Sequence, residues 1–104
     1  MSAATIDGRT IDVDQEGFLV NPDEWDESLA RTLASNIGLE LTDAHWQAIQ
    51  FARRDHSVTG ETPTLRRMAS GGGVSTKQMF ELFPKKPAKK LAYVAGLPKP
   101  VGCV

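Results

Sequence analysis

Prolines and glycines interrupt this chain so often that only short secondary-structure elements fit between them. Proline fixes φ and lacks a backbone N–H, so it begins or ends a helix but does not continue one. Glycine commonly follows the last turn of a helix. These residues fall at Pro22, Gly38, Pro63, residues 71–73, Pro84, Pro87 and Gly96. With 104 residues, the chain is therefore expected to form one domain built from short helices.

Capping residues lie beside these breaks and predict five helices. The predicted starts are Asn21, Thr42, Thr62, Ser75 and Pro87, and the predicted ends are Gly38, residues 56–60, residues 71–73, Pro84 and Gly96. In the first helix, Trp25, Leu29 and Leu33 repeat every four residues, which predicts a shared apolar face. Ser75 and Gln78 have the spacing of a capping box. The three glycines at residues 71–73 are interpreted as a flexible connector.

A β-hairpin is predicted ahead of the first helix. Asp7 and Gly8 form a two-residue turn signal between short runs of alternating apolar residues that include Ile11 and Val13. A third short strand is expected at residues 18–20. The predicted fold class is mainly α (α+β), with about five helices and a small N-terminal hairpin.

The last eight residues, LPKPVGCV, contain two prolines, one glycine and the chain's only cysteine, Cys103. Prolines exclude a regular helix or strand here, and they favour extended backbone in the residues before them. Residues 97–104 are therefore expected to form a flexible arm that carries the thiol away from a domain spanning residues 1–96. Gly102 leaves the backbone beside the sulfur open to close approach.

Charge is divided unequally along the chain. Residues 1–45 contain ten acidic and two basic residues, a formal charge of −8, and residues 46–104 contain three acidic and ten basic residues, a charge of +7. Both halves can simply be solvated surface. The alternative is a basic surface near the thiol that meets acidic partners. The first residues lack the apolar run of a signal peptide, and a single cysteine does not suit a disulfide scaffold, so a cytoplasmic protein without membrane segments is expected.

Few residues in this chain suit catalysis. His45 and His56 are the only histidines, and with Cys103 they do not have metal-ligand spacing, so no metal and no cofactor are predicted. His45 is interpreted as a structural or surface residue. No phosphate-binding glycine loop or nucleophile elbow is present. A thiol without its own base suits a carrier better than a stand-alone catalyst, because a partner can activate the exchange.

Several motifs together resemble the DsrC/TusE family of small sulfur-carrier proteins. They are LPKPVGCV at the end of the chain, FPKKPAKK and AYVAG before it, EGFL at residues 16–19, LT-AHW at residues 41–46 and TPTLRRM at residues 62–68. The resemblance covers essentially the whole chain, and the terminal motif is its specific part. It implies an orthogonal helical bundle with a small sheet and a C-terminal arm. It also implies that Cys103 carries sulfane sulfur as a persulfide.

The resemblance also assigns roles to other residues. Pro98, Lys99, Pro100 and Gly102 match the arm pattern and are expected to position the cysteine. Arg66 matches the arginine of the family's TP-x-x-R run, and it can meet a partner or simply be a surface charge. The partner-binding residues predicted from this and from the basic C-terminal half are Arg66, Lys85 and Lys89.

Ala92 separates two versions of the function. DsrC proper would have a second cysteine at this position, eleven residues before the terminal one, and this chain has alanine. That favours a TusE-like role, in which sulfur passes from a TusBCD-type donor complex to an MnmA-type tRNA thiouridylase, without direct tRNA contact. The alternatives are a DsrC-like partner or regulator in sulfur oxidation or sulfite reduction, including a Cys→Ala variant at Ala92. A helix-turn-helix nucleic-acid-binding module is a further alternative, based on Arg53, Arg54, Arg66 and Arg67.

Overall fold

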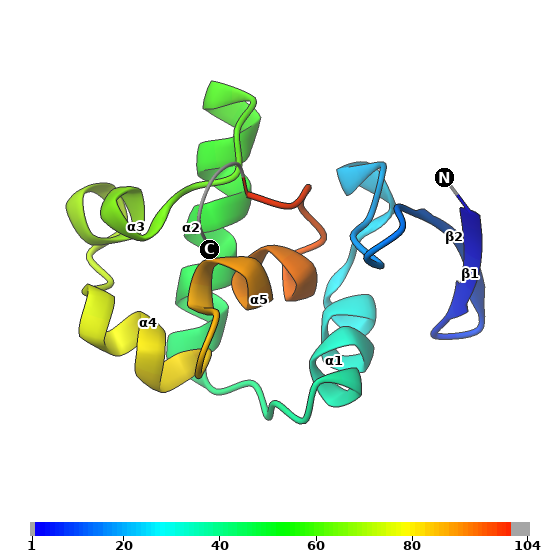
Figure 1. Ribbon diagram of the computed structural model, residues 1–104, viewed down its shortest axis with the longest axis horizontal. Helices are drawn as coiled ribbons and strands as arrows, with labels where there is room; N and C mark the ends of the chain where they lie inside the picture. The colour runs from blue at the N-terminus through cyan, green and yellow to red at the C-terminus, as the bar shows by residue number, and fades with distance from the viewer. Residues whose placement is uncertain (1, 101–104) are drawn as a thin grey trace.

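A two-stranded antiparallel sheet precedes five α-helices in the computed structural model, which describes residues 2–100 (Figure 1). The elements are β1 (Ser2–Ile6), β2 (Arg9–Val13), the 3₁₀ helix η1 (Pro22–Glu24), α1 (Glu27–Asn36), α2 (Asp43–Thr59), α3 (Leu65–Gly72), α4 (Thr76–Leu82) and α5 (Pro87–Val94). The predicted fold class is confirmed. No helix within residues 2–100 combines the length and apolar character needed to cross a membrane.

The hairpin forms where the sequence predicts it. Asp7 and Gly8 both have positive φ, 55° and 72°, as a tight two-residue turn between twisted strands requires. The predicted third strand is reduced to a single bridge between Val13 and Leu19. The carboxylate of Asp14 accepts the backbone N–H groups of Glu16 and Phe18. These two hydrogen bonds stabilise a turn at residues 14–18, and only the single bridge forms after it.

The first predicted helix is two elements, and the prediction that it runs unbroken from Asn21 is wrong. Asn21 caps only the short η1, and the chain is extended at Trp25 (ψ 144°). Asp26 then caps α1 by accepting the N–H of Leu29. Trp25 therefore does not share a helical face with Leu29 and Leu33. It is held by contacts with the C-terminal part of the chain, described below.

Residues 71–73 do not form a connector. Gly71 and Gly72 complete α3, and Gly73 ends it in the left-handed conformation (φ 68°). A Cβ on Gly72 would lie 2.8 Å from Cδ2 of Phe51, so glycine permits α3 to approach α2 closely. The carboxylate of Asp55 adds a second link, because it accepts two contacts from Arg67, at 2.8 and 3.0 Å.

His45 joins two helices, as its predicted structural role implies. Its Nδ1 accepts the N–H of Thr42 at 3.1 Å, which places the proton on Nε2. Nε2 then donates to the carbonyl of Leu82 at 2.8 Å. The ring also stands edge-on to Phe83, with centroids 5.2 Å apart. The start of α2 is thereby fastened to the end of α4.

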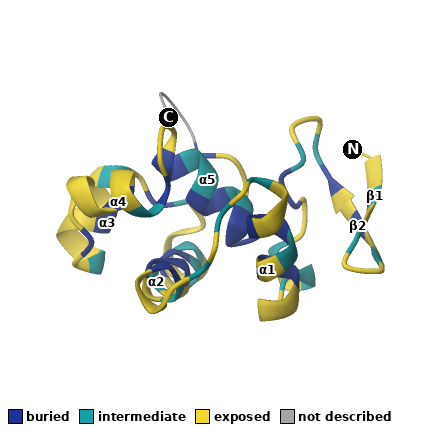
Figure 2. Cartoon of the chain, turned by 90° about the horizontal axis from the view of Figure 1, so that it is seen from below, coloured by how far each residue is buried: buried dark blue, intermediate teal, exposed yellow. Residues whose placement is uncertain are grey.

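The core surrounds α5, which packs against α1, α2 and α4. Figure 2 shows this helix as mostly buried among its more exposed neighbours. Ala92 and Val94 have no exposed surface, and Leu91 is 1% exposed. Met79 of α4 and Phe83, which follows the helix, are buried, but Phe80 is 47% exposed. The helix that leads into the C-terminal segment is therefore the most enclosed part of the fold.

Candidate functional site

The described part of the C-terminal segment, residues 97–100, lies against the domain. Leu97 is 1% exposed and belongs to the core, and Pro100 is buried as well. The Thr62 hydroxyl donates to the carbonyl of Pro98 at 2.7 Å. The expectation that the chain leaves the body at residue 97 is therefore wrong for these four residues, which we call the arm root. The predicted site residues Gly102 and Cys103 lie outside the described residues.

The chain turns sharply between α5 and the arm root. Gly96 has φ 69°, and the Leu97 N–H donates to the carbonyl of Ala92 at 3.0 Å. This is the left-handed glycine turn that commonly follows a helix. A Cβ on Gly96 would lie 2.4 Å from Cδ1 of Trp25. Glycine is thus required here both by its backbone conformation and by the indole packed against it.

Arg53 of α2 holds the same turn from another side. Its guanidinium donates to the carbonyls of Ala95 (2.8 Å) and Pro22 (3.1 Å) and lies 4.1 Å from the ring centre of Trp25. The indole Nε1 of Trp25 in turn donates to the carbonyl of Val94 at 2.9 Å. Partial burial lowers the pKa of Arg53 below that of a fully solvated guanidinium. Together these contacts fix the direction in which the arm root begins.

One carboxylate ties the arm root to α5. Glu16 contacts the ammonium of Lys99 at 2.7 Å and that of Lys89 at 3.2 Å. The hydrogen bond from Lys99, followed by that from Lys89, lowers the pKa of Glu16 below 4.5. All three groups are partly exposed, so solvent screens this cluster. Its role is therefore to orient Lys99 more than to stabilise the fold.

The predicted partner-binding residues occupy different environments. Arg66 on α3 and Lys85 before α5 are exposed, and neither makes an ion pair with another residue of the described part of the chain. Lys85 adopts positive φ, 75°. Lys89 is half-buried and paired with Glu16. The structure thus groups Lys89 with the arm root and leaves Arg66 on a separate helix.

The four arginines on which the helix-turn-helix alternative is based do not form one continuous surface. Arg53 is committed to the turn after α5, and Arg67 is paired with Asp55. Only Arg54 and Arg66 remain exposed without such partners among residues 2–100. This arrangement offers little of the continuous basic surface that phosphate binding uses.

Ala92 lies in the middle of the core. It has no exposed surface, and its carbonyl accepts the N–H of Leu97. The position at which the resemblance implies a second cysteine in DsrC proper is thus directly beneath the arm root. In this chain it contributes only a methyl group.

Sequence reasoning missed the side chains that hold the arm root. Trp25, Arg53 and Glu16 all act on residues far away in the chain, so local sequence spacing does not reveal these contacts. A groove of about 310 Å³ beside the arm root was also not foreseen; it is lined by His56, Glu61, Thr62, Thr64, Pro98 and Lys99, among others. The one available signal was the presence of Glu16 in the EGFL motif.

A small helical domain with an anchored C-terminal segment and one penultimate cysteine defines a DsrC-like protein. A family model described as "DsrC like protein" matches residues 5–104. The chain belongs to this family, which comprises TusE-type sulfurtransferases and DsrC-like sulfur carriers.

Relatives of known name or structure agree with this assignment. Sulfurtransferase TusE of Yersinia pseudotuberculosis is 39% identical over an alignment of 105 positions, and the alignment covers 94% of this chain and 97% of the relative. The NMR structure of Allochromatium vinosum DsrC is 37% identical, with a TM-score of 0.80, and the match covers 99% of this chain and 100% of that one. The crystal structure of dissimilatory sulfite reductase I (DsrI) is 30% identical, with a TM-score of 0.84 and the same coverage.

Proposed function

We propose that this protein accepts sulfane sulfur as a persulfide on Cys103 and relays it to a partner protein. The observation that carries the proposal is that the family match runs to residue 104 and so includes the only cysteine of the chain. The relatives named sulfurtransferase TusE support a transfer function in particular.

The proposed transfer moves one sulfur atom from a donor persulfide to the Cys103 thiolate. The Cys103 thiolate attacks the outer sulfur of a donor persulfide, R–S–SH, and forms a new S–S bond. The donor's own S–S bond breaks, and the donor sulfur leaves as a thiolate with the electron pair. One persulfide is consumed and one is made, so the step needs no external oxidant or reductant. Delivery repeats the same exchange in the opposite direction.

The contacts that hold the arm root support presentation of this sulfur close to the surface of the domain. Only two residues, Val101 and Gly102, lie between Pro100 and Cys103 in the sequence. In the proposal, Pro98, Lys99, Pro100 and Gly102 position the thiol, and a partner must approach the surface beside the arm root to reach it.

Ala92 favours relay over internal chemistry. With one cysteine, the chain cannot release its sulfur by forming an intramolecular disulfide, so the acceptor must be another molecule. We propose a TusBCD-type complex as the donor and an MnmA-type thiouridylase as the acceptor, with 2-thiouridine in tRNA as the final product. Arg66, Lys85 and Lys89 are proposed to contact these partners. The relay is proposed to be cytoplasmic, where thiols are kept reduced.

Intact-protein mass spectrometry tests the carrier step. After incubation with a sulfane-sulfur donor, the protein should gain the mass of one sulfur atom, and reductant should remove it. Cys103→Ser should show no gain while keeping the same circular dichroism spectrum. Absence of the gain in the parent protein, under conditions where a control thiol is loaded, would overturn the proposal. Thiolation of tRNA in a reconstituted relay then tests the tRNA pathway.

A second candidate is a role beside a sulfite reductase. It is favoured by the structural match to a chain in the crystal structure of dissimilatory sulfite reductase I, at a TM-score of 0.84. In that role the protein would bind the reductase but could not hold a trisulfide between two of its own cysteines. Binding to a purified sulfite reductase, with no stimulation of tRNA thiolation, would favour this candidate over the tRNA pathway.

A further inference from the structure

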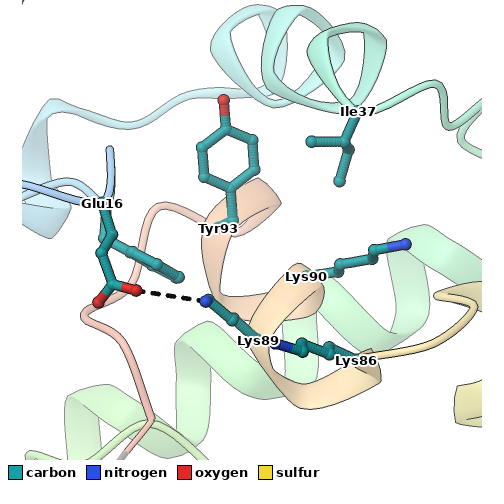
Figure 3. A pocket seen from close by; sticks show the side chains of 7 residues that line it. Glu16, Ile37, Lys86, Lys89, Lys90 and Tyr93 are labelled. Carbon is teal, nitrogen blue, oxygen red and sulfur yellow. Dashed lines mark hydrogen bonds and ion pairs between the residues drawn. The ribbon is translucent and has the colours of Figure 1, made fainter. Parts of the chain in front are cut away.

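A groove of about 390 Å³ runs beside α5, on the side that faces the Glu16 turn and the end of α1 (Figure 3). Three lysines and three apolar or aromatic side chains line it, with one carboxylate at its edge. The lining residues are Lys86, Lys89, Lys90, Phe18, Ile37, Tyr93 and Glu16. The volume lies in the range of about 300–1,000 Å³ that binding sites commonly have. We call this feature the α5 groove.

The described residues that line the α5 groove include three lysines and only one carboxylate, so the groove carries a net positive charge. Glu16 is the one carboxylate among the lining residues, and it is shared between Lys89 and Lys99. Lys90 donates to a neutral group, the carbonyl of Pro84, at 2.6 Å. Lys86 forms no ion pair with any residue in the range 2–100. Among residues 2–100, no carboxylate therefore pairs with Lys86 or Lys90.

The wall opposite the lysines is apolar. Phe18 is 2% exposed and stands edge-on to Tyr93, with ring centroids 6.0 Å apart. Ile37 is half-buried at the end of α1, and Figure 3 shows it across from Lys90. An apolar or aromatic side chain placed between these residues would leave water without displacing any of the chain's own ion pairs.

The spacing of Lys86 and Lys90 along the chain matches the spacing of alternate side chains in an extended peptide. Lys86 is the N-cap of α5, and Lys90 lies one turn into the helix, with its N–H donating to the Lys86 carbonyl; four helical residues rise about 6 Å. Alternate side chains of an extended strand point the same way and are about 6.6 Å apart. A strand lying in the groove could direct alternate carboxylates to the lysines and the intervening side chains to Phe18 and Ile37. The ion pair between Lys89 and Glu16 is an example of such a contact within the chain.

We propose that the α5 groove binds an extended acidic segment of a partner protein, with carboxylates on Lys86 and Lys90 and an apolar or aromatic anchor between Phe18, Ile37 and Tyr93. This inference goes beyond the proposed function, because it requires no sulfur chemistry at Cys103.

NMR titration of the full-length ¹⁵N-labelled protein tests the inference. The probe is the peptide Glu-Leu-Glu-Trp-Glu with blocked ends, and its matched control has glutamine at the three acidic positions. The acidic probe should shift the amide signals of the groove residues saturably, and added salt should weaken it. The glutamine peptide should bind at least about tenfold more weakly, because it lacks the charges that complement the lysines.

Charge reversal locates the binding on the protein. Lys86→Glu combined with Lys90→Glu should weaken the acidic probe by at least about tenfold, because two attractive contacts become repulsive. Lys77→Glu makes a similar change at an exposed position of α4, outside the groove, and should alter the affinity by less than about twofold. Unchanged affinity in the double variant would overturn the proposal.

Two further results would also overturn it. One is the absence of saturable shifts at millimolar probe, or shifts spread over lysines outside the groove. The other is that the groove signals move with protein concentration alone, without peptide. That result would identify the occupant as the acidic N-terminal half of a second copy. Loading of Cys103 from a small polysulfide is measured separately, so failure of the carrier function would not be mistaken for failure of the groove.

Discussion

The indole of Trp25 lies so close to Gly96 that no side chain fits between them: a Cβ on Gly96 would be 2.4 Å from Cδ1 of the ring. The two residues are 71 positions apart in the sequence, and the contact joins the acidic N-terminal half to the beginning of the arm root. The hydrogen bond from Trp25 Nε1 to the Val94 carbonyl strengthens the same junction. This contact determines where the C-terminal segment starts.

Gly96→Ala should destabilise the protein more than a glycine substitution at an open position. The new methyl group meets the indole and its Cβ, and moving them should cost about 1–3 kcal/mol. The positive φ adds about 1–2 kcal/mol. Gly73→Ala is the matched control, because Gly73 has φ 68° but nothing within 4 Å of its Cβ position. Urea denaturation measures both, and equal losses would contradict the packing argument.

Gly71→Ala and Gly72→Ala, both within α3, should have opposite effects. Alanine normally gains about 1 kcal/mol over glycine in a helix interior. At Gly72 the added Cβ would lie 2.8 Å from the ring of Phe51, so a net loss of stability is expected. At Gly71 the close neighbour is the flexible end of Arg67, which can move, so the change should be neutral or stabilising.

A double substitution checks this explanation. In a Phe51→Ala background, Gly72→Ala should become neutral or stabilising, because the ring that opposes it has gone. Thermal or urea unfolding of the four proteins in this cycle gives the coupling energy. A loss at Gly72 that persists without Phe51 would show that the ring is not its cause.

Leu97→Ala should cost about 2–4 kcal/mol of unfolding free energy, because the side chain is 1% exposed and packs in the core. Val58→Ala removes a similar side chain that is 83% exposed, and it should change stability by less than about 0.5 kcal/mol. Chemical denaturation distinguishes these outcomes. A small loss at Leu97 would restore the expectation that the arm begins at residue 97.

The carboxyl group of Glu16 should titrate below its ordinary pKa of 4.5, first because of Lys99 and then because of Lys89. A lowered pKa in the folded state means that the stabilisation is fully present above pH 4.5 and is lost as the pH falls through the lowered value. Carbon-detected NMR titration should show the pKa of Glu16 rising more in Lys99→Ala than in Lys89→Ala. Lys77→Ala is the control and should leave it unchanged.

Local signals predicted most of the secondary structure because they act within a few residues. Asp7 and Gly8 set the hairpin turn, Ser75 and Gln78 close their capping box, and Pro87 begins α5. These interactions depend on sequence spacing alone. The family resemblance added the arrangement of the helices, which spacing does not provide.

The predictions that are wrong concern residues whose structure depends on contacts with distant parts of the chain. Asn21 and Pro22 look like the start of a helix, but Trp25 is drawn to Val94, 69 residues away, and the helix begins again at Asp26. In the sequence, Gly72 resembles part of a connector, because no nearby residue indicates that Phe51 packs against it. Leu97 is followed by residues typical of a loop, yet the core contains it.

The anchoring of Leu97 also has a mechanical consequence. A partner that pulls on the last residues applies its force first to a side chain enclosed in the core and to the turn that Trp25 and Arg53 hold. The load is therefore shared with η1 and α2 before it can unwind the last turn of α5. The arm root is thus a fixed attachment point, and a force applied to it is not borne by α5 alone.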